Sequence, residues 1–242
     1  MLPAFNQFLP AALLILATAL FAACGGGASR ESTSKQETAA ASPTASTTPA
    51  ETVPKIVAFG DSLTAGYGLA PQESYPALLQ KLIDADGFKY EVVNAGVSGD
   101  TSAGGVRRID WSLDAGGVRF VILELGANDF LRGQPVAETR KNLSDIIKRA
   151  RSRGAQVLLA GMLTTTESGR DYEVEIRDAF KSLAAENDII LIPFFLEGVA
   201  GIDKLNQQDR IHPNAEGTKL VAATVYRYLK PLLEKDRRGS DE

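Results

Sequence analysis

The chain contains a single histidine, His212, so any reaction that needs an imidazole base must use this residue. A serine hydroxyl is a weak nucleophile at neutral pH and reacts only when a neighbouring base takes its proton. Ser62, which follows a short apolar run, is the candidate nucleophile. Asp209 lies three residues before His212, close enough in sequence to orient the ring and to stabilise its protonated form. These residue types predict nucleophilic catalysis by Ser62, with His212 as the base and Asp209 as the acid that orients the base.

The domain that must position these residues begins near Lys55, where short apolar runs start to alternate with helical periodicity. The runs are rich in Val, Ile, Leu and Phe with little alternation, as expected for strands covered on both faces. We expect strands at 55–59, 90–93, 120–125, 156–160 and 189–192. Apolar spacing of three and four residues predicts helices over 74–85, 136–153, 172–186 and 215–233. The alternation predicts an α/β fold, a three-layer α/β/α arrangement around a five-stranded, mostly parallel sheet.

Polar residues follow the expected strands at the points where parallel sheets bind ligands. The segment 60–68 follows the first strand, 94–100 the second and 126–129 the third, while 209–213 precedes the last helix. Because the carboxyl ends of parallel strands share one edge of a sheet, these four segments should meet there. Together they supply a hydroxyl, a base, an acid and several hydrogen-bond donors.

These segments resemble the conserved blocks of the GDSL, or SGNH, hydrolase superfamily. Ser62 matches the block-one serine, Gly96 the block-two glycine and Asn128 the block-three asparagine. His212 matches the block-five histidine, and Asp209 matches the acid three residues before it. One block alone would be a weak signal, but four in this order are highly specific, and the resemblance covers the whole domain.

Within the superfamily, the chain is most similar to the thioesterase, arylesterase and lysophospholipase branch. The likeness is carried by residues 59–68, 74–76, 124–129, 131–133 and 211–214. It implies a flavodoxin-like fold and a serine esterase that hydrolyses carboxylic esters or thioesters through an acyl-enzyme on Ser62. It also implies an oxyanion hole made by the backbone N–H groups of Ser62 and Gly96 and the side-chain amide of Asn128. By position, the acyl chain would lie along residues 97–103, 130–133 and 163–172.

Other interpretations of the same residues remain open. The same triad could deacetylate a glycan or transfer an acyl group, and the domain could instead bind acylated ligands without turnover. Ser98 also follows a strand, but it lacks the Gly-x-Ser-x-Gly elbow of other hydrolases because position 100 is Asp. We interpret Asp129 as structural, and we interpret four aromatic residues as packing residues: Tyr67, Tyr75, Phe194 and Phe195.

The N-terminal segment has the composition of a targeting signal. Residues 1–29 carry no charged side chain, and the apolar run 8–23 suits a signal peptide but is short for a membrane-spanning helix, which needs about 20 residues. The run ends in Leu20-Phe21-Ala22-Ala23-Cys24, which resembles the lipobox of bacterial lipoproteins, with Phe21 where leucine is usual. We therefore expect a signal peptide over 1–23 and lipidation of Cys24. Two acyl chains on this cysteine would anchor the protein stably to a membrane.

The composition after Cys24 predicts the remaining organisation of the chain. Residues 24–54 are rich in Gly, Ser, Thr, Ala and Pro and cannot bury enough apolar surface to fold, so we expect a disordered tether. The hydrolase domain is expected over 55–234, followed by a charged C-terminal tail over 235–242. This organisation would place the domain in the bacterial cell envelope, attached to a membrane through Cys24.

The overall composition argues against several other classes of function. A net charge of −4 gives no electrostatic basis for binding nucleic acid. One cysteine and one histidine are too few for a typical zinc site, and the sequence contains no P-loop and no Gly-x-Gly-x-x-Gly motif. We therefore expect no metal and no cofactor. The expected partner is a small acyl ester or thioester substrate, and the resemblance favours a monomer.

Overall fold

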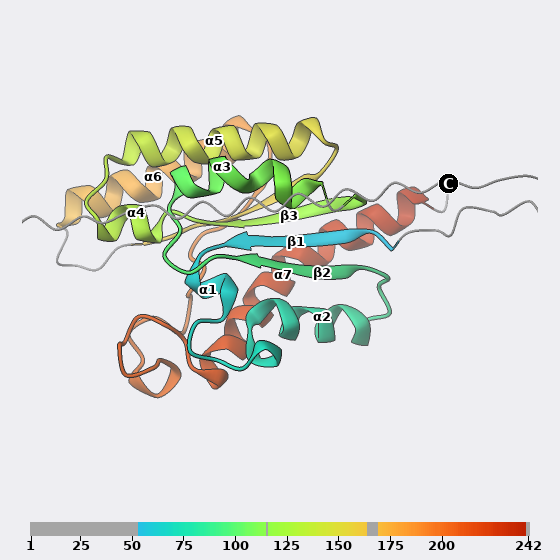
Figure 1. Ribbon diagram of the computed structural model, residues 1–242, viewed down its shortest axis with the longest axis horizontal. Coiled ribbons are helices and arrows are strands. Elements are labelled where there is room, and N and C mark those ends of the chain that lie inside the picture. The colour runs from blue at the N-terminus through green and yellow to red at the C-terminus, as the bar shows by residue number, and fades with distance from the viewer. Residues whose placement is uncertain (1–52, 115, 164–168, 241–242) are drawn as a thin grey trace, which may run out of the picture. The chain divides into compact units, whose positions relative to one another are not determined.

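The computed structural model describes residues 53–114, 116–163 and 169–240 (Figure 1). The predicted signal peptide, Cys24 and nearly all of the predicted tether lie outside the described residues. Residues 164–168, which belong to the predicted acyl-binding segment 163–172, also lie outside them. Within the described part of the chain, no helix is both long enough and apolar enough to cross a membrane.

Five strands form one sheet in the order β2-β1-β3-β4-β5, and every neighbouring pair is parallel. The strands are β1 Lys55–Gly60, β2 Glu91–Gly96, β3 Val118–Glu124, β4 Gln156–Ala160 and β5 Ile190–Ile192. This confirms the predicted α/β fold and the position of each predicted strand. The order is that of flavodoxin-like folds. Strand β2 is added on one side of β1, whereas β3, β4 and β5 follow on the other side, so the order of strand addition switches between β1 and β3. Ligands of such sheets bind at the carboxyl ends of these two strands.

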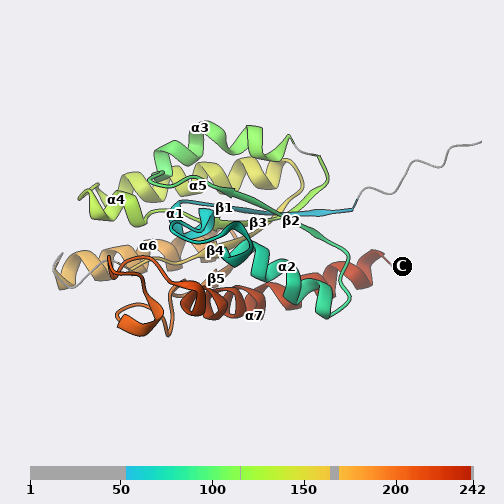
Figure 2. The ribbon, with the colours of Figure 1, turned by 60° about the horizontal axis from the view of Figure 1, so that its bottom comes forward.

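Helices cover both faces of the sheet, with α2 and α7 on one face and α3, α5 and α6 on the other (Figures 1 and 2). The long helices are α2 Tyr75–Ala85, α3 Ser102–Leu113, α5 Val136–Ser152, α6 Arg170–Glu186 and α7 Ala215–Ser240. Short helical turns lie at the carboxyl edge of the sheet or in its loops: α1 Ser62–Ala65, η1 Pro71–Glu73, α4 Ala127–Leu131 and η3 Asp203–Leu205.

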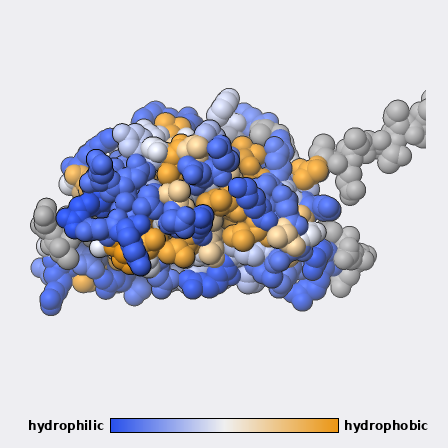
Figure 3. Space-filling view, turned by 90° about the horizontal axis from the view of Figure 1, so that it is seen from below, coloured by the Kyte–Doolittle hydropathy of each residue, from blue (hydrophilic) through white to orange (hydrophobic). Residues whose placement is uncertain are grey.

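The core lies on both sides of the central strands. The β1 residues Ile56, Val57, Ala58 and Phe59 are fully buried, because helices cover both of their faces. This explains why the β1 sequence is continuously apolar rather than alternating. The outer surface of α2 and α7 is largely polar, with apolar side chains exposed between the charged ones (Figure 3).

Helix α3 was not predicted from the sequence, and its glycines account for the omission. Gly104 and Gly105 each disfavour a helix by about 1 kcal/mol relative to alanine. In the structure they allow a close approach: a Cβ on Gly105 would lie 2.4 Å from a methyl carbon of Leu125, and one on Gly104 would lie 1.6 Å from Asp100 Oδ1. The helix therefore packs against the end of the sheet at a distance that only glycine permits.

Helix α7 extends seven residues beyond its predicted end at 233. Asp236 is buried, accepts a hydrogen bond from Tyr90 Oη at 2.7 Å and pairs with Arg119 Nε at 2.7 Å. These contacts hold the helix against the amino ends of β2 and β3. Part of the segment expected to be a charged tail therefore packs as helix on the folded domain.

Candidate active site

Ser62 is the first residue of the one-turn helix α1, directly after β1. Asp61 caps this helix, because its Oδ1 accepts a hydrogen bond from Leu63 N at 3.0 Å. Gly66, at a φ of +79°, ends the helix in a left-handed conformation and donates its N–H to Ser62 O. A Cβ at position 60 would lie 2.1 Å from Thr64 Oγ1, so glycine is required where the chain turns from strand into helix. The turn therefore holds the Ser62 backbone in one conformation.

His212 and Asp209 lie in the loop between η3 and α7. Asn206 and Pro213 form an antiparallel bridge across the base of this loop, and Gln207 N donates to His212 O at 2.8 Å. The Asn206 side chain, buried in the loop, donates to Val199 O at 2.7 Å and so attaches the loop to the preceding segment. The loop is therefore fixed on both sides of the imidazole.

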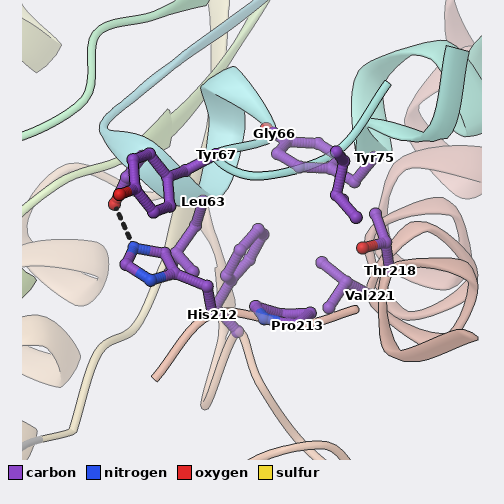
Figure 4. Close-up of a pocket in the computed structure, with 11 residues that line it drawn as sticks. Leu63, Gly66, Tyr67, Tyr75, His212, Pro213, Thr218 and Val221 are labelled. Atoms are coloured by element: carbon purple, nitrogen blue, oxygen red, sulfur yellow. Dashed lines mark hydrogen bonds between the residues drawn. The ribbon is translucent and has the colours of Figure 1, made fainter. Parts of the chain in front are cut away.

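The structure brings the three predicted triad residues into hydrogen-bonding contact across 150 positions of sequence. His212 Nε2 lies 2.9 Å from Ser62 Oγ (Figure 4), and His212 Nδ1 lies 2.7 Å from Asp209 Oδ2. Asp209 Oδ1 accepts the backbone N–H groups of Ile211 and His212, both at 3.0 Å. A carboxylate on Nδ1 favours the tautomer whose Nε2 is free to accept a proton from the hydroxyl.

The surroundings of Asp209 keep it ionised. Desolvation raises the pKa of this carboxyl, but hydrogen bonds from the backbone and ring of His212 and from the backbone of Ile211 outweigh it. The net effect lowers the pKa of Asp209 to about 2. The group is therefore a negatively charged acceptor at any pH at which the protein would work.

The two other predicted oxyanion donors flank the Ser62 turn. Gly96 ends β2 opposite Gly60 in the sheet register, and a Cβ on Gly96 would lie 2.2 Å from Ala65 N. Its own N–H donates to Asn94 Oδ1 at 3.0 Å. Asn128, in α4, donates its Nδ2 to Asp61 Oδ2 and to Asp100 O, both at 2.9 Å. An oxyanion formed at Ser62 would compete with these acceptors for the same protons.

Two buried carboxyl groups lie close to the Ser62 turn. Burial is the largest influence on Asp61 and raises its pKa to about 6, against the lowering effects of the Leu63 N–H and of His212. Burial likewise raises the pKa of Glu124, at the end of β3, well above its usual value, and the charge of Asp61 raises it further. Neighbouring carboxyl groups disfavour each other's ionisation, so Asp61 ionises first and Glu124 stays neutral.

Tyr67 belongs to the site, which corrects its interpretation as a packing residue. Its ring centroid lies 4.8 Å from that of His212 at an interplanar angle of 41°, and the residue is 54% exposed. Tyr75, by contrast, is fully buried and packs edge-on against Phe195 at 5.3 Å, as predicted. The sequence offered one indication that Tyr67 belongs to the site: it directly follows Gly66 and is close to Ser62 in the chain.

The structure separates Ser98 and Asp129 from the predicted triad. Ser98 lies in an exposed turn after β2, whereas the single imidazole of the chain contacts Ser62. Asp129 is buried and accepts hydrogen bonds from Ser102 N at 2.8 Å and from Thr139 Oγ1 at 3.2 Å. It thereby ties α4 to the starts of α3 and α5, which supports its interpretation as structural.

A narrow hollow beside Ser62 and His212 is lined by residues of α1 and the loop after it, of α2 and of α7, and by Phe195 (Figure 4). Its cavity volume is about 10 Å³, room for about one water molecule. It is too small for a long acyl chain. Across the described ranges, no group of three or more His, Cys, Asp or Glu side chains is placed to hold a metal ion.

Comparison with known proteins identifies the family. The model of the GDSL-like Lipase/Acylhydrolase family matches residues 58–220. Esterase TesA of Pseudomonas aeruginosa is 40% identical over 178 residues, which cover 74% of this chain and 89% of that protein. Thioesterase 1/protease 1/lysophospholipase L1 of Escherichia coli (strain K12) is 36% identical over 181 residues, 75% of this chain and 86% of that protein.

The fold comparison agrees with the sequence comparison. The crystal structure of TesA matches with a TM-score of 0.72 at 39% identity and covers 74% of this chain and 99% of that one. A family model that spans most of the folded domain and relatives of this identity are sufficient to assign membership. The chain belongs to the GDSL-like lipase/acylhydrolase family and is a hydrolase that acts on ester bonds.

Proposed function

We propose that the protein is a serine esterase in which Ser62 is the nucleophile, His212 the general base and Asp209 the acid that orients the base. The observation that carries this proposal is the continuous line of two hydrogen bonds, 2.9 Å from Ser62 Oγ to His212 Nε2 and 2.7 Å from His212 Nδ1 to Asp209 Oδ2. A nucleophile, a base and an orienting group in hydrogen-bond contact are the signature of an activated serine.

The reaction follows from this line of contacts. Ser62 Oγ attacks the carbonyl carbon of the ester while its proton moves to His212 Nε2, and the carbonyl oxygen becomes an oxyanion. The backbone N–H groups of Ser62 and Gly96 and the amide of Asn128 hold the oxyanion. The leaving alcohol or thiol takes the proton from Nε2 as its bond to the acyl carbon breaks. Water then attacks the acyl-enzyme by the same steps and releases the acid and free Ser62.

The acyl chain of the substrate lies on the side of Ser62 away from the narrow hollow. The hollow admits about one water molecule, whereas Val97 after β2 is 47% exposed and Leu131 in α4 is 58% exposed. Exposed apolar side chains in the segments that follow β2 and β3, at the same edge of the sheet as Ser62, suit an acyl chain, since each buried methylene contributes about 0.8 kcal/mol. The names of the relatives, an esterase and a thioesterase/lysophospholipase, suggest carboxylic esters, thioesters and lysophospholipids as substrates.

Steady-state assays with p-nitrophenyl esters from acetate to palmitate would test the serine mechanism. We expect Ser62→Ala and His212→Ala each to lower kcat by about 10⁴-fold or more, because either change removes the activated nucleophile. Ser98→Ala tests the rival nucleophile and should retain wild-type kcat on the acetate ester, which has no chain to reach the segment 97–103. Circular dichroism would establish that all three variants fold. Activity that survives in Ser62→Ala would overturn the assignment, and a wild type inactive on every ester would direct the assays to acetylated glycans.

Substitution of Leu131 would test the side on which the acyl chain lies. Leu131→Gln should raise KM for long-chain esters and leave acetate hydrolysis unchanged, because only a long chain reaches this position. Leu220→Gln changes a similarly exposed leucine, 44% exposed, on the outer surface of α7 and should have no effect. An equal change in KM for acetate and long-chain esters would place the acyl chain elsewhere.

We further propose that the protein is a monomeric lipoprotein of the cell envelope, attached through diacylated Cys24. The apolar run 8–23 and the lipobox-like end at Cys24 support this proposal. In a bacterial host, Cys24→Ala should abolish incorporation of labelled palmitate and release the protein from the membrane fraction. Cys24→Ala protein that stays labelled and membrane-bound would exclude this anchor.

A further inference from the structure

Arg108, on α3, makes four contacts at the carboxyl ends of β1 and β2. Its Nη2 donates to Gly60 O at 2.8 Å, and its Nη1 donates to Ala95 O at 2.7 Å. Nε donates to Asp100 Oδ2 at 2.7 Å, and Cζ lies 3.9 Å from the centroid of the Phe59 ring. The side chain is only 18% exposed. Every nitrogen of the guanidinium group is therefore directed at the edge of the sheet that carries Ser62.

The two carbonyl groups that Arg108 binds belong to peptide units beside the proposed oxyanion hole. Ala95 O is part of the same peptide unit as the Gly96 N–H. Gly60 O is part of the same unit as the Asp61 N–H, one residue before Ser62. A cation bound to a carbonyl oxygen fixes the plane of the peptide unit and polarises it, which strengthens its N–H as a donor.

Asp100 connects Arg108 to the third proposed donor. The Asp100 carboxylate forms an ion pair with the guanidinium, and its backbone oxygen accepts Asn128 Nδ2 at 2.9 Å. The peptide unit of Gly96, the turn of Ser62 and the amide of Asn128 are thus each linked to one guanidinium group, directly or through Asp100. No other side chain among the described residues is shown to contact both the end of β1 and the end of β2 in this way.

The two glycines of α3 make this arrangement possible. A Cβ on Gly105 would lie 3.2 Å from the Phe59 ring and closer still to Leu125, so a larger residue would push the helix outwards. A displaced helix would carry Arg108 away from both carbonyl groups. The close packing of α3 and the reach of Arg108 are therefore one structural feature.

We propose that Arg108 is a positioning residue for the oxyanion hole: it aligns and polarises the donors without touching the substrate. The inference rests on the proposed function of Ser62. Because the oxyanion exists only in the tetrahedral states, loss of alignment lowers kcat and leaves KM unchanged. A guanidinium group matches this role because its planar fork binds two carbonyl oxygens at once, which a lysine ammonium on a single stem does not reproduce.

Steady-state kinetics of Arg108→Gln, Arg108→Lys and Arg107→Gln would test the proposal. We expect Arg108→Gln to lower kcat about 10- to 100-fold with KM within about twofold, less than the loss from removing an oxyanion donor outright. Arg108→Lys should fall between Arg108→Gln and wild type, because it keeps the charge and loses the fork. Arg107 is exposed on the same helix, so Arg107→Gln removes one charge as a matched control and should behave as wild type.

Chemical rescue separates positioning from a purely structural role. Guanidinium chloride at a non-denaturing concentration should restore part of kcat to Arg108→Ala and leave Arg107→Ala unchanged. Arg108→Gln with kcat within about threefold of wild type would overturn the proposal, as would a loss expressed only in KM. If Arg108→Gln does not fold, Arg108→Lys, which retains the cation over Phe59, is judged by the same criteria.

The Ser62→Ala variant, assayed beside these proteins, distinguishes the two proposals. An active Ser62→Ala protein would defeat the proposed function itself. An inactive Ser62→Ala protein together with a wild-type-like Arg108→Gln protein would defeat only the role of Arg108.

Discussion

Glu124 Oε2 accepts a hydrogen bond from Thr64 Oγ1 at 2.7 Å, within the turn that carries Ser62. The same oxygen accepts Asp61 N at 3.2 Å, so one carboxyl group at the end of β3 holds both sides of this turn. Glu124 is fully buried, and among the described residues its Oε1 has no hydrogen-bond partner. A buried charge with an unsatisfied oxygen is costly, which agrees with the raised pKa of Glu124 and its neutral state.

This burial predicts a pH dependence of stability that Glu124→Gln should remove. The raised pKa means that the folded state keeps a proton that the unfolded state releases above about pH 4.5. The contribution of Glu124 to the free energy of unfolding is therefore complete below that pH. It is lost as the pH rises towards the pKa of Glu124 in the folded state, by at most about 1.4 kcal/mol per pH unit. Glutamine has the same shape and no charge, so the variant should gain stability relative to wild type as pH rises.

Urea unfolding at about pH 5 and about pH 8 would measure this gain as the difference between variant and wild type. Glu91→Gln, at an exposed position at the start of β2, controls for the loss of one negative charge. The same pH trend in both variants would show that Glu124 is not the group responsible.

Asp209→Asn should lower kcat by about 10²- to 10⁴-fold while the protein stays folded. Asparagine can still accept the N–H groups of Ile211 and His212, but it removes the charge that stabilises the protonated ring. The lowered pKa of about 2 means that Asp209 stays ionised as pH falls through the assay range, so its titration does not contribute to the acid limb of the activity profile. Steady-state kinetics across pH would check both statements.

Asp203→Asn is the matched control for this change. Asp203 lies in η3, just before the same loop, is 75% exposed and pairs with Arg210, so its loss should leave kcat unchanged. Equal kinetics of Asp209→Asn and wild type would remove Asp209 from the mechanism.

Tyr67→Ala should lower kcat/KM about 2- to 10-fold, and Tyr67→Phe should match wild type. The ring contact with His212 is the feature that matters, and aromatic contacts of this kind contribute about 0.5–1.5 kcal/mol. Trp111→Ala is a suitable control, because Trp111 is 78% exposed on α3. A large loss of activity in Tyr67→Phe would instead point to a role for the hydroxyl.

Asp236→Ala should lower the free energy of unfolding by about 1.5–3 kcal/mol without changing kcat. The substitution leaves the Arg119 guanidinium and the Tyr90 hydroxyl without their shared acceptor, at the edge of the sheet opposite Ser62. Urea unfolding would measure the loss, with Arg238→Ala, exposed at the end of the same helix, as control. A chain ending at residue 234 should lose at least as much stability, and unchanged stability would mean that the end of α7 is dispensable.

The parts of this protein that could be predicted from sequence are those encoded by local pattern. The fully buried run of β1 is continuously apolar, and the residues that can do chemistry follow the ends of the strands, so sheet topology alone brings Ser62 near Asn128. The fold followed from these patterns, and the resemblance to the family's blocks supported the assignment of Ser62, Asp209 and His212.

The parts that could not be predicted depend on tertiary contacts. Helix α3 forms although Gly104 and Gly105 have a low helix propensity. Only the close packing of these two glycines in the folded protein explains why they are there. Arg108 and Glu124 have ordinary sequence contexts, and their importance arises from the carbonyl, amide and hydroxyl groups that surround them in the fold. The role of Asp236 could not be predicted for the same reason, because its hydrogen-bond partners are far from it in the sequence.

The solitary imidazole between Ser62 and Asp209 also serves as a built-in spectroscopic label. Because the chain has one histidine, protein grown with isotope-labelled histidine would give NMR signals from a single ring. Those signals would report the tautomer and protonation state of His212 without any assignment step. Free enzyme and acyl-enzyme could then be compared at the nitrogen that faces Ser62, which enzymes with several histidines do not allow so directly.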